Sequence, residues 1–329
     1  MSVPALRALR QLLPNAHITL ATKSSTEAIF AEADFVNELL IFTGDSVMAQ
    51  AAKWREQKFD AAILFPNSFK VALVAKLARI PLRLGYATEG RGFLLSNAAK
   101  IPDWRSERHE SFFYLNLIAE LEQRLFQTSN TLSQGLQDQL QISEQRQSAA
   151  AQFLRDNGVR GERPLIAICP GSINSRAKRW PADRFAALAD RLQAELKAEV
   201  LLIGSPAELE VSREVTAAMN QPAITLTGQT DLAMAGAILS QVDLLITNDT
   251  GPAHLAAALR RPTLVIFGPT NPLTTRPLSE VAEIVRIPPE CAPCMLRDCP
   301  IDHRCMTAIE VDDVFARAVG MLREHVMAN

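Results

Sequence analysis

Residues 244–256 read LLITNDTGPAHLA, and this stretch decides the fold of the chain. Its apolar run ends abruptly in polar residues and a glycine, and then passes into an Ala/Leu pattern, which is typical of a strand, a tight loop and a helix. Pro252 suits the first helical turn, because the N–H that proline lacks would be unpaired there anyway. Asp249 or Thr250 can cap the helix with a side-chain oxygen. The stretch therefore predicts one strand-loop-helix unit of a parallel sheet.

The loop of this unit also predicts an anion site, above all one for phosphate. Gly251 allows a ligand to approach the backbone closely. A helix N-terminus directs free amide N–H groups and the positive end of its dipole towards a negative charge. Asp249 and His254 stand beside that point, and their side chains suit sugar hydroxyls and diphosphate oxygens. An ordinary capped helix explains the same residues, and this stretch alone leaves both interpretations open.

The surrounding half of the chain repeats the same unit. Near-continuous apolar strands separated by single helices predict a parallel sheet that is covered on both faces. The expected strands are 165–169, 200–203, 224–226, 244–247 and 264–267, and the expected helices are 182–196, 207–219, 232–241 and 252–259. Ligands of such sheets bind at the carboxyl ends of the strands. Three loops leave those ends here, at 170–172, 204–206 and 248–251.

The first half follows the scheme less distinctly. The expected strands are 18–21 and 61–65, and the expected helices are 45–57, 68–78 and 109–126. The Gln/Ser-rich stretch 127–147 predicts a connection between domains, followed by a helix over 149–157 and a last amphipathic helix over 311–325. We therefore expect an N-terminal domain at 1–148 and a C-terminal domain at 149–329, with the last helix a candidate for packing back on the first domain.

Composition places the chain among globular proteins. It has 329 residues, of which 48% are hydrophobic and 21% charged. No apolar run reaches the roughly 18 residues of a membrane span and no signal segment is present, so a cytoplasmic location is expected. A net charge of −2 and the lack of a basic run with aromatics argue against nucleic acid as a partner. No dinucleotide or P-loop fingerprint is present, which disfavours a nicotinamide enzyme.

Two charged residues in the strand-end loops are candidates for the site. Lys178 follows the 170–172 loop and places a cation where a phosphate leaving group would need to be neutralised. Glu208 stands in the first turn of a helix, where it can accept hydrogen bonds from ribose hydroxyls. The helix dipole alone also favours an acid at that position, so helix stability and ligand binding remain equal explanations.

A polar loop in the first half offers further candidates. Asn67, Ser68 and Lys70 follow an apolar strand in the sequence LFPNSFK. Asn67 or Ser68 can cap the next helix, or these side chains can contact an acceptor substrate. The sequence does not decide between the two.

Four of the five cysteines fall in one short segment, namely Cys291, Cys294, Cys299 and Cys305. Such clustering in a cytoplasmic protein suggests metal binding or redox chemistry before a disulfide framework. The spacing is compatible with a structural zinc site but does not match the paired-CxxC pattern, so a Cys-rich loop without metal is the preferred interpretation. Cys169, at the end of an apolar strand, is expected in the core.

Taken together, PGS at 170–172, AKRWP at 177–181, Gly204-Ser205 and TNDTGPAH at 247–254 resemble the ADP-heptose:lipopolysaccharide heptosyltransferases. The segment LFPNSFK, with Gly85-Tyr86 and Arg91-Gly92 downstream, looks most like the heptosyltransferase II branch of that family. The Cys-rich run is similar to an insert found in many members. The resemblance spans nearly the whole chain.

This resemblance implies a GT-B architecture, in which two Rossmann-like domains face each other across a cleft. It implies an inverting, metal-independent transfer of heptose from ADP-heptose to the lipid A-linked inner core, without a cofactor, at the cytoplasmic face of the inner membrane with peripheral membrane contact. The family's donor residues fall on Gly171, Ser172, Lys178, Glu208, Asp249, Thr250, Gly251 and His254, with Lys178 stabilising the leaving group. Asn67, Ser68 and Lys70 would lie on the acceptor side.

One part of the family pattern is missing. The family's general base is an Asp in a Gly-Asp loop after the first strand, and this sequence opens directly on a helical pattern, Val3–Arg10. We therefore expect Met1 to be an internal methionine of a longer gene product, with donor binding retained and turnover severely reduced. An upstream reading frame without a Gly-Asp segment would refute this expectation.

Two rival readings stay open at this point. The first is a GT-B enzyme that uses another nucleotide sugar, which would share the donor loop but not the LFPNSFK segment. The second is a non-catalytic nucleotide-sugar-binding protein of the same fold, which would bind ADP-heptose without transferring it.

Overall fold

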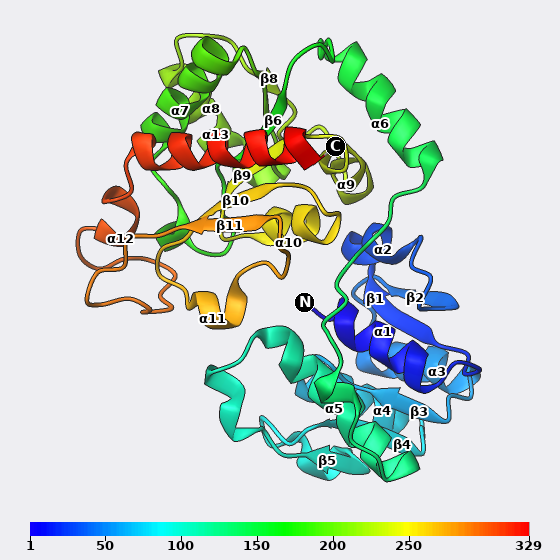
Figure 1. Cartoon of the computed structure of the whole chain (residues 1–329). Coiled ribbons are helices and arrows are strands. Elements are labelled where there is room, and N and C mark those ends of the chain that lie inside the picture. Colours follow the sequence, from blue (N-terminus) through cyan, green and yellow to red (C-terminus); the bar gives the residue numbers. More distant parts are fainter. Residues whose placement is uncertain (329) are drawn as a thin grey trace. The chain divides into compact units, whose positions relative to one another are not determined.

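The computed structural model describes residues 1–328, with side chains through residue 324. The chain divides into two compact units, Met1–Asp138 (unit 1) and Gln139–Asn329 (unit 2), and Figure 1 colours it from blue to red along its length. The division falls inside the Gln/Ser-rich stretch expected to connect two domains. Asn329, the last residue of the expected second domain, lies outside the described residues.

Unit 2 is built on one parallel sheet of six strands, in the order β11-β10-β9-β6-β7-β8. The strands are β6 (Leu165–Cys169), β7 (Glu199–Leu202), β8 (Ile224–Thr225), β9 (Leu244–Asn248), β10 (Thr263–Ile266) and β11 (Ala282–Val285). The first five were expected from the sequence. The sixth was not, because the edge strand β11 is short, half-exposed and interrupted by Glu283.

Helices cover both faces of this sheet. They are α6 (Glu144–Asp156), α7 (Ala182–Leu196), α8 (Leu209–Ala218), α9 (Leu232–Leu239), α10 (Gly251–Ala258), α11 (Pro272–Thr275), α12 (Arg304–Thr307) and α13 (Val311–Ala328). Alternate residues of a strand face opposite sides. Ile166 and Ile168 accordingly join one apolar core with α7 and α13, and Ala167 and Cys169 join another with α6 and α9. A strand buried on both faces explains why β6 is apolar throughout.

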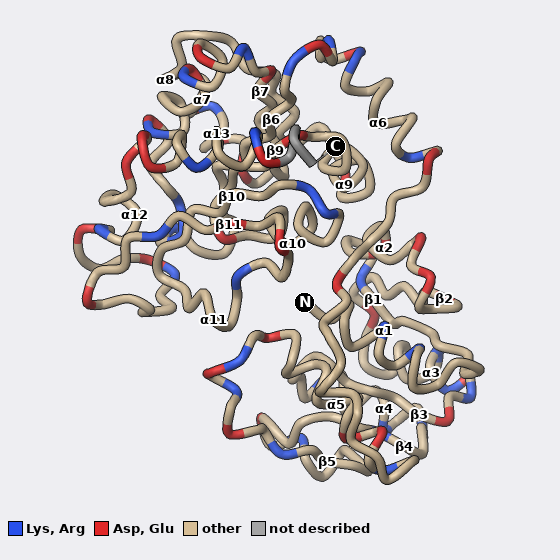
Figure 2. Tube along the Cα trace, in the orientation of Figure 1, with Lys and Arg blue, Asp and Glu red and all other residues tan. Residues whose placement is uncertain are grey.

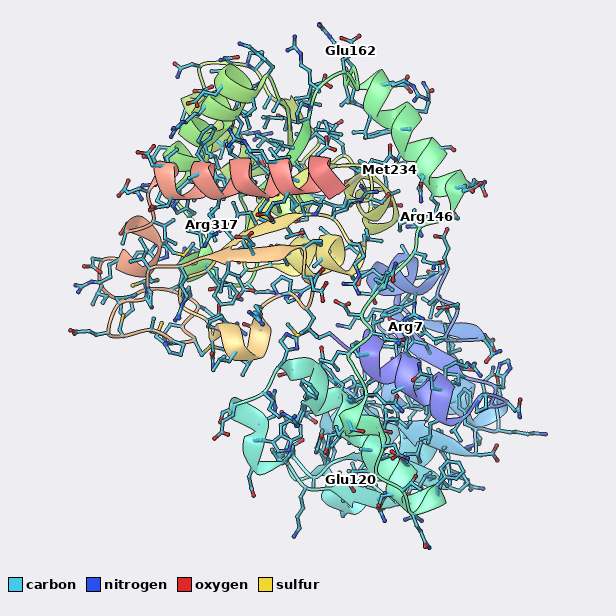
Figure 3. All side chains as sticks on the ribbon, viewed as in Figure 1. Arg7, Glu120, Arg146, Glu162, Met234 and Arg317 are labelled. Atoms are coloured by element: carbon cyan, nitrogen blue, oxygen red, sulfur yellow. The ribbon has the colours of Figure 1, made fainter. Side chains whose placement is uncertain are left out.

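The first and last helices of unit 2, α6 and α13, both pack against other elements of the same unit. The apolar face of α13 packs on α7 and along β9, β10 and β11, so it is used within this unit (Figure 1, red). α6 packs against α9, where the guanidinium of Arg146 donates a hydrogen bond of 2.9 Å to the carbonyl of Ala233, beside Met234 (Figure 3).

The strand order places a reversal between β6 and β9. From β6 the chain moves outward through β7 and β8, and it then crosses back to pair β9 with the other side of β6. Ligands of open parallel sheets bind in the crevice outside the carboxyl ends of the strands at such a reversal. The loops after β6 and β9 therefore lie where a ligand site is expected.

Unit 1 holds two separate parallel sheets among the described residues. The first pairs β1 (Thr19–Lys23) with β2 (Glu38–Phe42), and the second has the order β3 (Ala61–Ile63), β4 (Leu82–Tyr86) and β5 (Asn97–Ala99). Its α-helices are α1 (Val3–Leu12), α2 (Ser24–Phe30), α3 (Val47–Glu56), α4 (Phe69–Leu77) and α5 (Glu110–Phe126). The buried face of α1, with Ala5 and Leu9, packs on α5.

Both units carry charges of both signs. Figure 2 shows Lys and Arg among Asp and Glu in each unit, separated by uncharged stretches such as α9 and β9. Within residues 1–328, no helix is both long and apolar enough to pass through a membrane.

A buried carboxylate fixes the end of α5. Glu122 accepts hydrogen bonds from the hydroxyls of Thr131 (2.6 Å) and Thr128 (2.7 Å) and from the N–H groups of Asn130 (2.9 Å) and Thr131 (2.8 Å). Burial alone would raise the pKa of Glu122, but these bonds outweigh it and lower the pKa to about 2 from 4.5. The chain leaving α5 is thus held by one ionised side chain.

We expect this carboxylate to make unit 1 sensitive to acid. Because the pKa is lower in the folded state, its stabilisation is fully present above the unfolded pKa of 4.5 and is lost as the pH falls from there to about 2. The contribution at pH 7 is about 2 kcal/mol, allowing for solvent screening. Urea unfolding of Glu122→Gln should show this loss at pH 7 and little further loss down to pH 3. The control Glu120→Gln changes an exposed acid of the same helix (Figure 3) and should behave as the unchanged chain, and equal behaviour of both variants would contradict the expectation.

Candidate functional site

The side chain of Asn248 joins the loops at the strand reversal. This residue ends β9 and is fully buried. Its amide nitrogen donates to the carbonyls of Pro170 (2.8 Å) and Gly171 (3.2 Å), and its oxygen accepts from the N–H of Trp180 (3.0 Å). A single side chain therefore fixes both ends of the 170–180 loop to the start of the 248–251 loop. The sequence signal was an amide at the end of an apolar strand, and it was not singled out.

A buried ion pair follows directly. Lys178 Nζ lies 2.8 Å from Oδ2 of Asp249 and 3.2 Å from its backbone carbonyl oxygen. The same Oδ2 accepts a hydrogen bond of 2.7 Å from the hydroxyl of Thr270. Asp249 is 3% exposed, whereas the Lys178 side chain is 24% exposed. The Lys178 side chain thus has a fixed ammonium position while remaining partly exposed. Thr270 was not predicted from the sequence.

The ion pair corrects the expected capping of α10. Thr250 occupies the N-cap position, but its hydroxyl makes no cap hydrogen bond and instead donates to the carbonyl of Asn248 at 3.3 Å. Asp249 is committed to Lys178 and Thr270. The N-cap side chain thus leaves the first turn of α10 uncapped, and the positive end of the helix dipole stays available to another group.

Gly251 lies at the open end of this helix. A Cβ atom built there would meet no atom within 4 Å. The half-buried His254 stands on the same helix, one turn further along. The start of α10 therefore offers an open approach to the backbone, next to Asp249 and the ammonium group of Lys178 that pairs with it, which suits an anion.

Glu208 is fixed by its own turn and by Gly171. Its Oε2 accepts hydrogen bonds from the N–H (2.8 Å) and hydroxyl (2.9 Å) of Ser205, which form a capping box. Its Oε1 lies 2.0 Å from where a Cβ of Gly171 would be, so only glycine fits there. Oε2 of Glu208 stabilises the start of the helix, whereas Oε1 faces the strand-end loop at Gly171. The structure therefore brings Gly171 and Glu208 into contact, as it does Lys178 and Asp249.

Two further predicted residues lie in the same loop region. Ser172 is buried, and its carbonyl accepts hydrogen bonds from Nε (3.2 Å) and a terminal nitrogen (3.0 Å) of Arg179. Cys169 is fully buried, and burial together with the nearby charge of Glu208 raises the pKa of its thiol to about 12. This thiol stays protonated at neutral pH, in keeping with a core position.

The loop at 66–70 of unit 1 is organised by a buried arginine. The guanidinium of Arg91 donates to the carbonyls of Tyr86 (2.9 Å), Pro66 (2.5 Å) and Ser68 (3.3 Å) and to the side-chain oxygen of Asn67 (3.0 Å). Burial lowers the pKa of Arg91, and the charge of Glu89 opposes this. Arg91 was quoted only as part of a motif, and its role was not predicted.

The other acceptor-side candidates differ in their contacts. Ser68 stands at the N-cap of α4 without a cap bond from its side chain. The exposed Lys70 donates to the carbonyl of Asp45 at 3.2 Å. Asn67 is therefore fixed by Arg91, and Lys70 is held only by a surface contact. The expected side-chain cap of α4 by Asn67 or Ser68 is not seen, because Ser68 occupies the N-cap position without a cap hydrogen bond.

The four clustered cysteines do not assemble a metal site. Residues 1–328 contain no group of three or more His, Cys, Asp or Glu side chains placed to hold a metal ion. Cys305 is buried in α12, Cys294 and Cys299 are half-buried, and Cys291 is exposed. All four are free thiols, three of them in the loop before α12 and Cys305 in that helix, and among the described residues they are not grouped as metal ligands.

Comparisons with known proteins agree with this arrangement. Residues 47–304 match the sequence model of glycosyltransferase family 9 (heptosyltransferase). The chain is 36% identical over 242 residues to lipopolysaccharide heptosyltransferase 2 of Salmonella typhimurium, a match covering 71% of this chain and 66% of that protein. Identity to the Escherichia coli K12 protein of the same name is 36% over 244 residues, with the same coverage. The matched stretch thus spans just under two thirds of each of these relatives.

A solved structure extends the likeness over both units. The structure of E. coli ADP-heptose lps heptosyltransferase II has a TM-score of 0.85 and 30% identity, and the match covers 98% of this chain and 94% of that one. The expected α/β fold of the GT-B class and the resemblance drawn from the sequence motifs are confirmed, and an enzyme for another nucleotide sugar is not favoured. The chain belongs to glycosyltransferase family 9, the heptosyltransferase family.

Proposed function

We propose that this chain transfers heptose from ADP-heptose to the heptosyl-Kdo inner core of lipid A-linked lipopolysaccharide. The observation that carries the proposal is the Lys178–Asp249 pair beside the open N-terminus of α10, at the strand reversal of unit 2. A diphosphate has the charge, size and hydrogen-bond acceptors that such a group of donors binds.

The reaction is an inverting displacement. A hydroxyl oxygen of the acceptor attacks the anomeric carbon of the heptose, and the bond from that carbon to the diphosphate oxygen breaks. ADP leaves with the electron pair, and the hydroxyl proton passes to a general base. None of the site residues named above is assigned that role, so transfer by this chain is expected to be slow while donor binding is retained. Negative charge grows on the diphosphate as the bond breaks, so a fixed cation stabilises the transition state more than the ground state. Lys178 supplies this cation, and Asp249 with Thr270 holds it in place.

The other donor residues receive roles from their positions. Thr250 and Gly251 lie at the start of α10, where their backbone N–H groups are assigned to the diphosphate, and His254 is assigned to the diphosphate and sugar. The free carboxylate oxygen of Glu208 accepts from ribose hydroxyls. Gly171 and Ser172 form the wall of the adenosine site. Unit 2 thereby binds the whole donor.

Unit 1 supplies the acceptor side in this proposal. Asn67, Ser68 and Lys70 contact the anionic inner core, and Arg91 keeps their loop in shape. Because the acceptor is linked to lipid A, transfer takes place at the cytoplasmic face of the inner membrane through peripheral contact.

The deciding experiment measures donor binding and transfer separately. Calorimetry should detect binding of ADP and ADP-heptose but not of UDP-sugars. ADP release should then require both ADP-heptose and a heptosyl-Kdo-lipid A acceptor. A preference for UDP-sugars would overturn the proposal, and binding of ADP-heptose by a folded chain from which no acceptor receives heptose would favour the non-catalytic binding protein.

The substitution Gly251→Ala distinguishes an effect on donor binding from an effect on the stability of the fold. The new methyl group meets no atom within 4 Å, so thermal stability should be unchanged or slightly higher. It would occupy the place of the diphosphate, and ADP should bind at least about tenfold more weakly, as expected for overpacking of 1–3 kcal/mol. Thermal melts and calorimetry with ADP give the two readouts. Unchanged ADP affinity would place the diphosphate elsewhere.

A further inference from the structure

The Cys-rich segment, residues 291–305, holds the residue that precedes Lys178. The N–H of Ala177 donates to the carbonyl of Arg297 at 2.9 Å. The carbonyl of Ala177 accepts from Nε2 of His303 at 2.6 Å, which requires the proton of the imidazole to be on Nε2 in the neutral ring. Both backbone polar groups of Ala177 are thus paired with this one segment.

Further contacts extend along the same loop. The hydroxyl of Ser175 donates to the carbonyl of Arg297 at 3.2 Å, and Arg176 forms an exposed ion pair of 2.6 Å with Asp298. The exposed pair adds little stability, because solvent screens it. The bonds to Ala177 and Ser175 therefore form the main connection between the two segments.

The other side of the Cys-rich segment is anchored beside Asp249. The N–H of Met295 donates to the carbonyl of Pro269 at 3.0 Å, next to Thr270, which binds the Asp249 carboxylate. Met306 and Cys305 pack directly on Gly268, where a Cβ would lie 2.3 Å from the Met306 sulfur. The segment thus connects the loop that carries Lys178 to the loop that supports its partner.

We propose that the Cys-rich segment is part of the donor site and that His303 is a positioning residue for Lys178. This inference rests on the proposed function, in which Lys178 binds the donor diphosphate. The peptide bond is planar, so fixing the carbonyl of Ala177 fixes the peptide plane that leads into Lys178. The long lysine side chain then starts from one backbone orientation, which lowers the entropy lost when its ammonium meets the diphosphate.

The backbone of His303 supports this role. Its φ of 57° lies in the left-handed region, which a histidine adopts at an energetic cost. Glycine adopts the same conformation without that cost. His303→Gly therefore removes the imidazole while leaving the local backbone relaxed, and His303→Gln restores an N–H donor at a similar reach.

The test measures ADP affinity of the full chain by calorimetry in a double-mutant cycle. His303→Gly should weaken ADP binding roughly fivefold to tenfold, the effect of one hydrogen bond. His303→Gln should recover most of that loss. In a Lys178→Ala background His303→Gly should cause no further loss, because there is then no ammonium to position. The matched control is His17→Gln, which changes an exposed histidine of unit 1 and should leave ADP affinity unchanged.

Each outcome separates the inference from the proposed function. An equal loss on His303→Gly with and without Lys178 would overturn the positioning role and assign His303 to general stability. Unchanged affinity of His303→Gly, with a clear loss in Lys178→Ala, would overturn it as well. Failure of the unchanged chain to bind ADP would instead contradict the proposed function.

Discussion

Replacing Gly171 with alanine is expected to weaken ADP binding by about a hundredfold. The added Cβ would lie 2.0 Å from Oε1 of Glu208, 2.5 Å from its Cδ and 2.6 Å from its Cγ. Glu208 cannot move aside without breaking its two bonds to Ser205, because it is nearly buried in its own turn. Overpacking of this kind costs 1–3 kcal/mol and the lost hydrogen bonds a similar amount, so a hundredfold change, about 2.7 kcal/mol, is a moderate expectation. Calorimetry with ADP measures it.

Two variants make the cause of this loss visible. Gly320→Ala places a methyl group in open space within α13, so it should stabilise the chain by roughly 0.5–1 kcal/mol and leave ADP affinity unchanged. The double variant Gly171→Ala/Glu208→Ala removes the clash and should recover the stability lost to it, but neither the stability that the capping box supplies nor the full affinity. If Gly171→Ala melted and bound ADP like the unchanged chain, the contact between Gly171 and Glu208 would have no role in the site.

Arg91→Met should destabilise unit 1 by at least about 3 kcal/mol. The methionine fills the buried space but leaves three carbonyls and the Asn67 side chain without their donor, and each unsatisfied buried acceptor costs about 1–3 kcal/mol. The transition that reports unit 1 in calorimetric or urea unfolding should move to milder conditions. ADP affinity should be retained wherever the chain stays folded, because the residues proposed to bind the donor lie in unit 2.

Two control variants test whether the effect at Arg91 depends on its positive charge and on its burial. Arg91→Lys keeps the positive charge but loses the planar fork, so its stability should fall between those of the unchanged chain and Arg91→Met. Arg124→Met changes an exposed arginine of α5 and should shift stability by no more than about 0.5 kcal/mol. Equal stability of Arg91→Met and Arg124→Met would show that the 66–68 loop does not depend on the guanidinium.

The sequence predicted unit 2 better than unit 1 for a physical reason. β6 and β9 are buried on both faces, so each is a continuous apolar run, and the amphipathic pattern of α7 gave its exact bounds, Ala182–Leu196. In unit 1, β2, β4, β5 and α2 were not predicted. These elements are short, and β4 contains Arg83 and Gly85, whose roles appear only in the fold. A short apolar run such as β2 does not distinguish strand from helix.

Individual residues of the candidate site could be proposed from the sequence, but the contacts between them could not. Lys178 and Asp249 were each recognised from a loop motif, yet 71 residues separate them and no pattern joins them. Thr270 and His303 carry no local signal, because their importance comes from the atoms they reach across the fold. Buried hydrogen-bond partners of this kind are defined by tertiary structure alone.

The pairing of β6 with β9 also has a consequence during protein synthesis. The N–H of Leu165 and the carboxylate of Asp243, which bond at the start of these strands, are 78 residues apart. During translation the 170–180 loop is therefore synthesised long before the 248–251 loop, which completes the candidate site. Since Asn248 fixes these loops to each other, an unfinished or truncated product that stops before β9 has the 170–180 loop without the contacts that hold it in place. The proposed nucleotide site is therefore expected to form only after the centre of the sheet has closed.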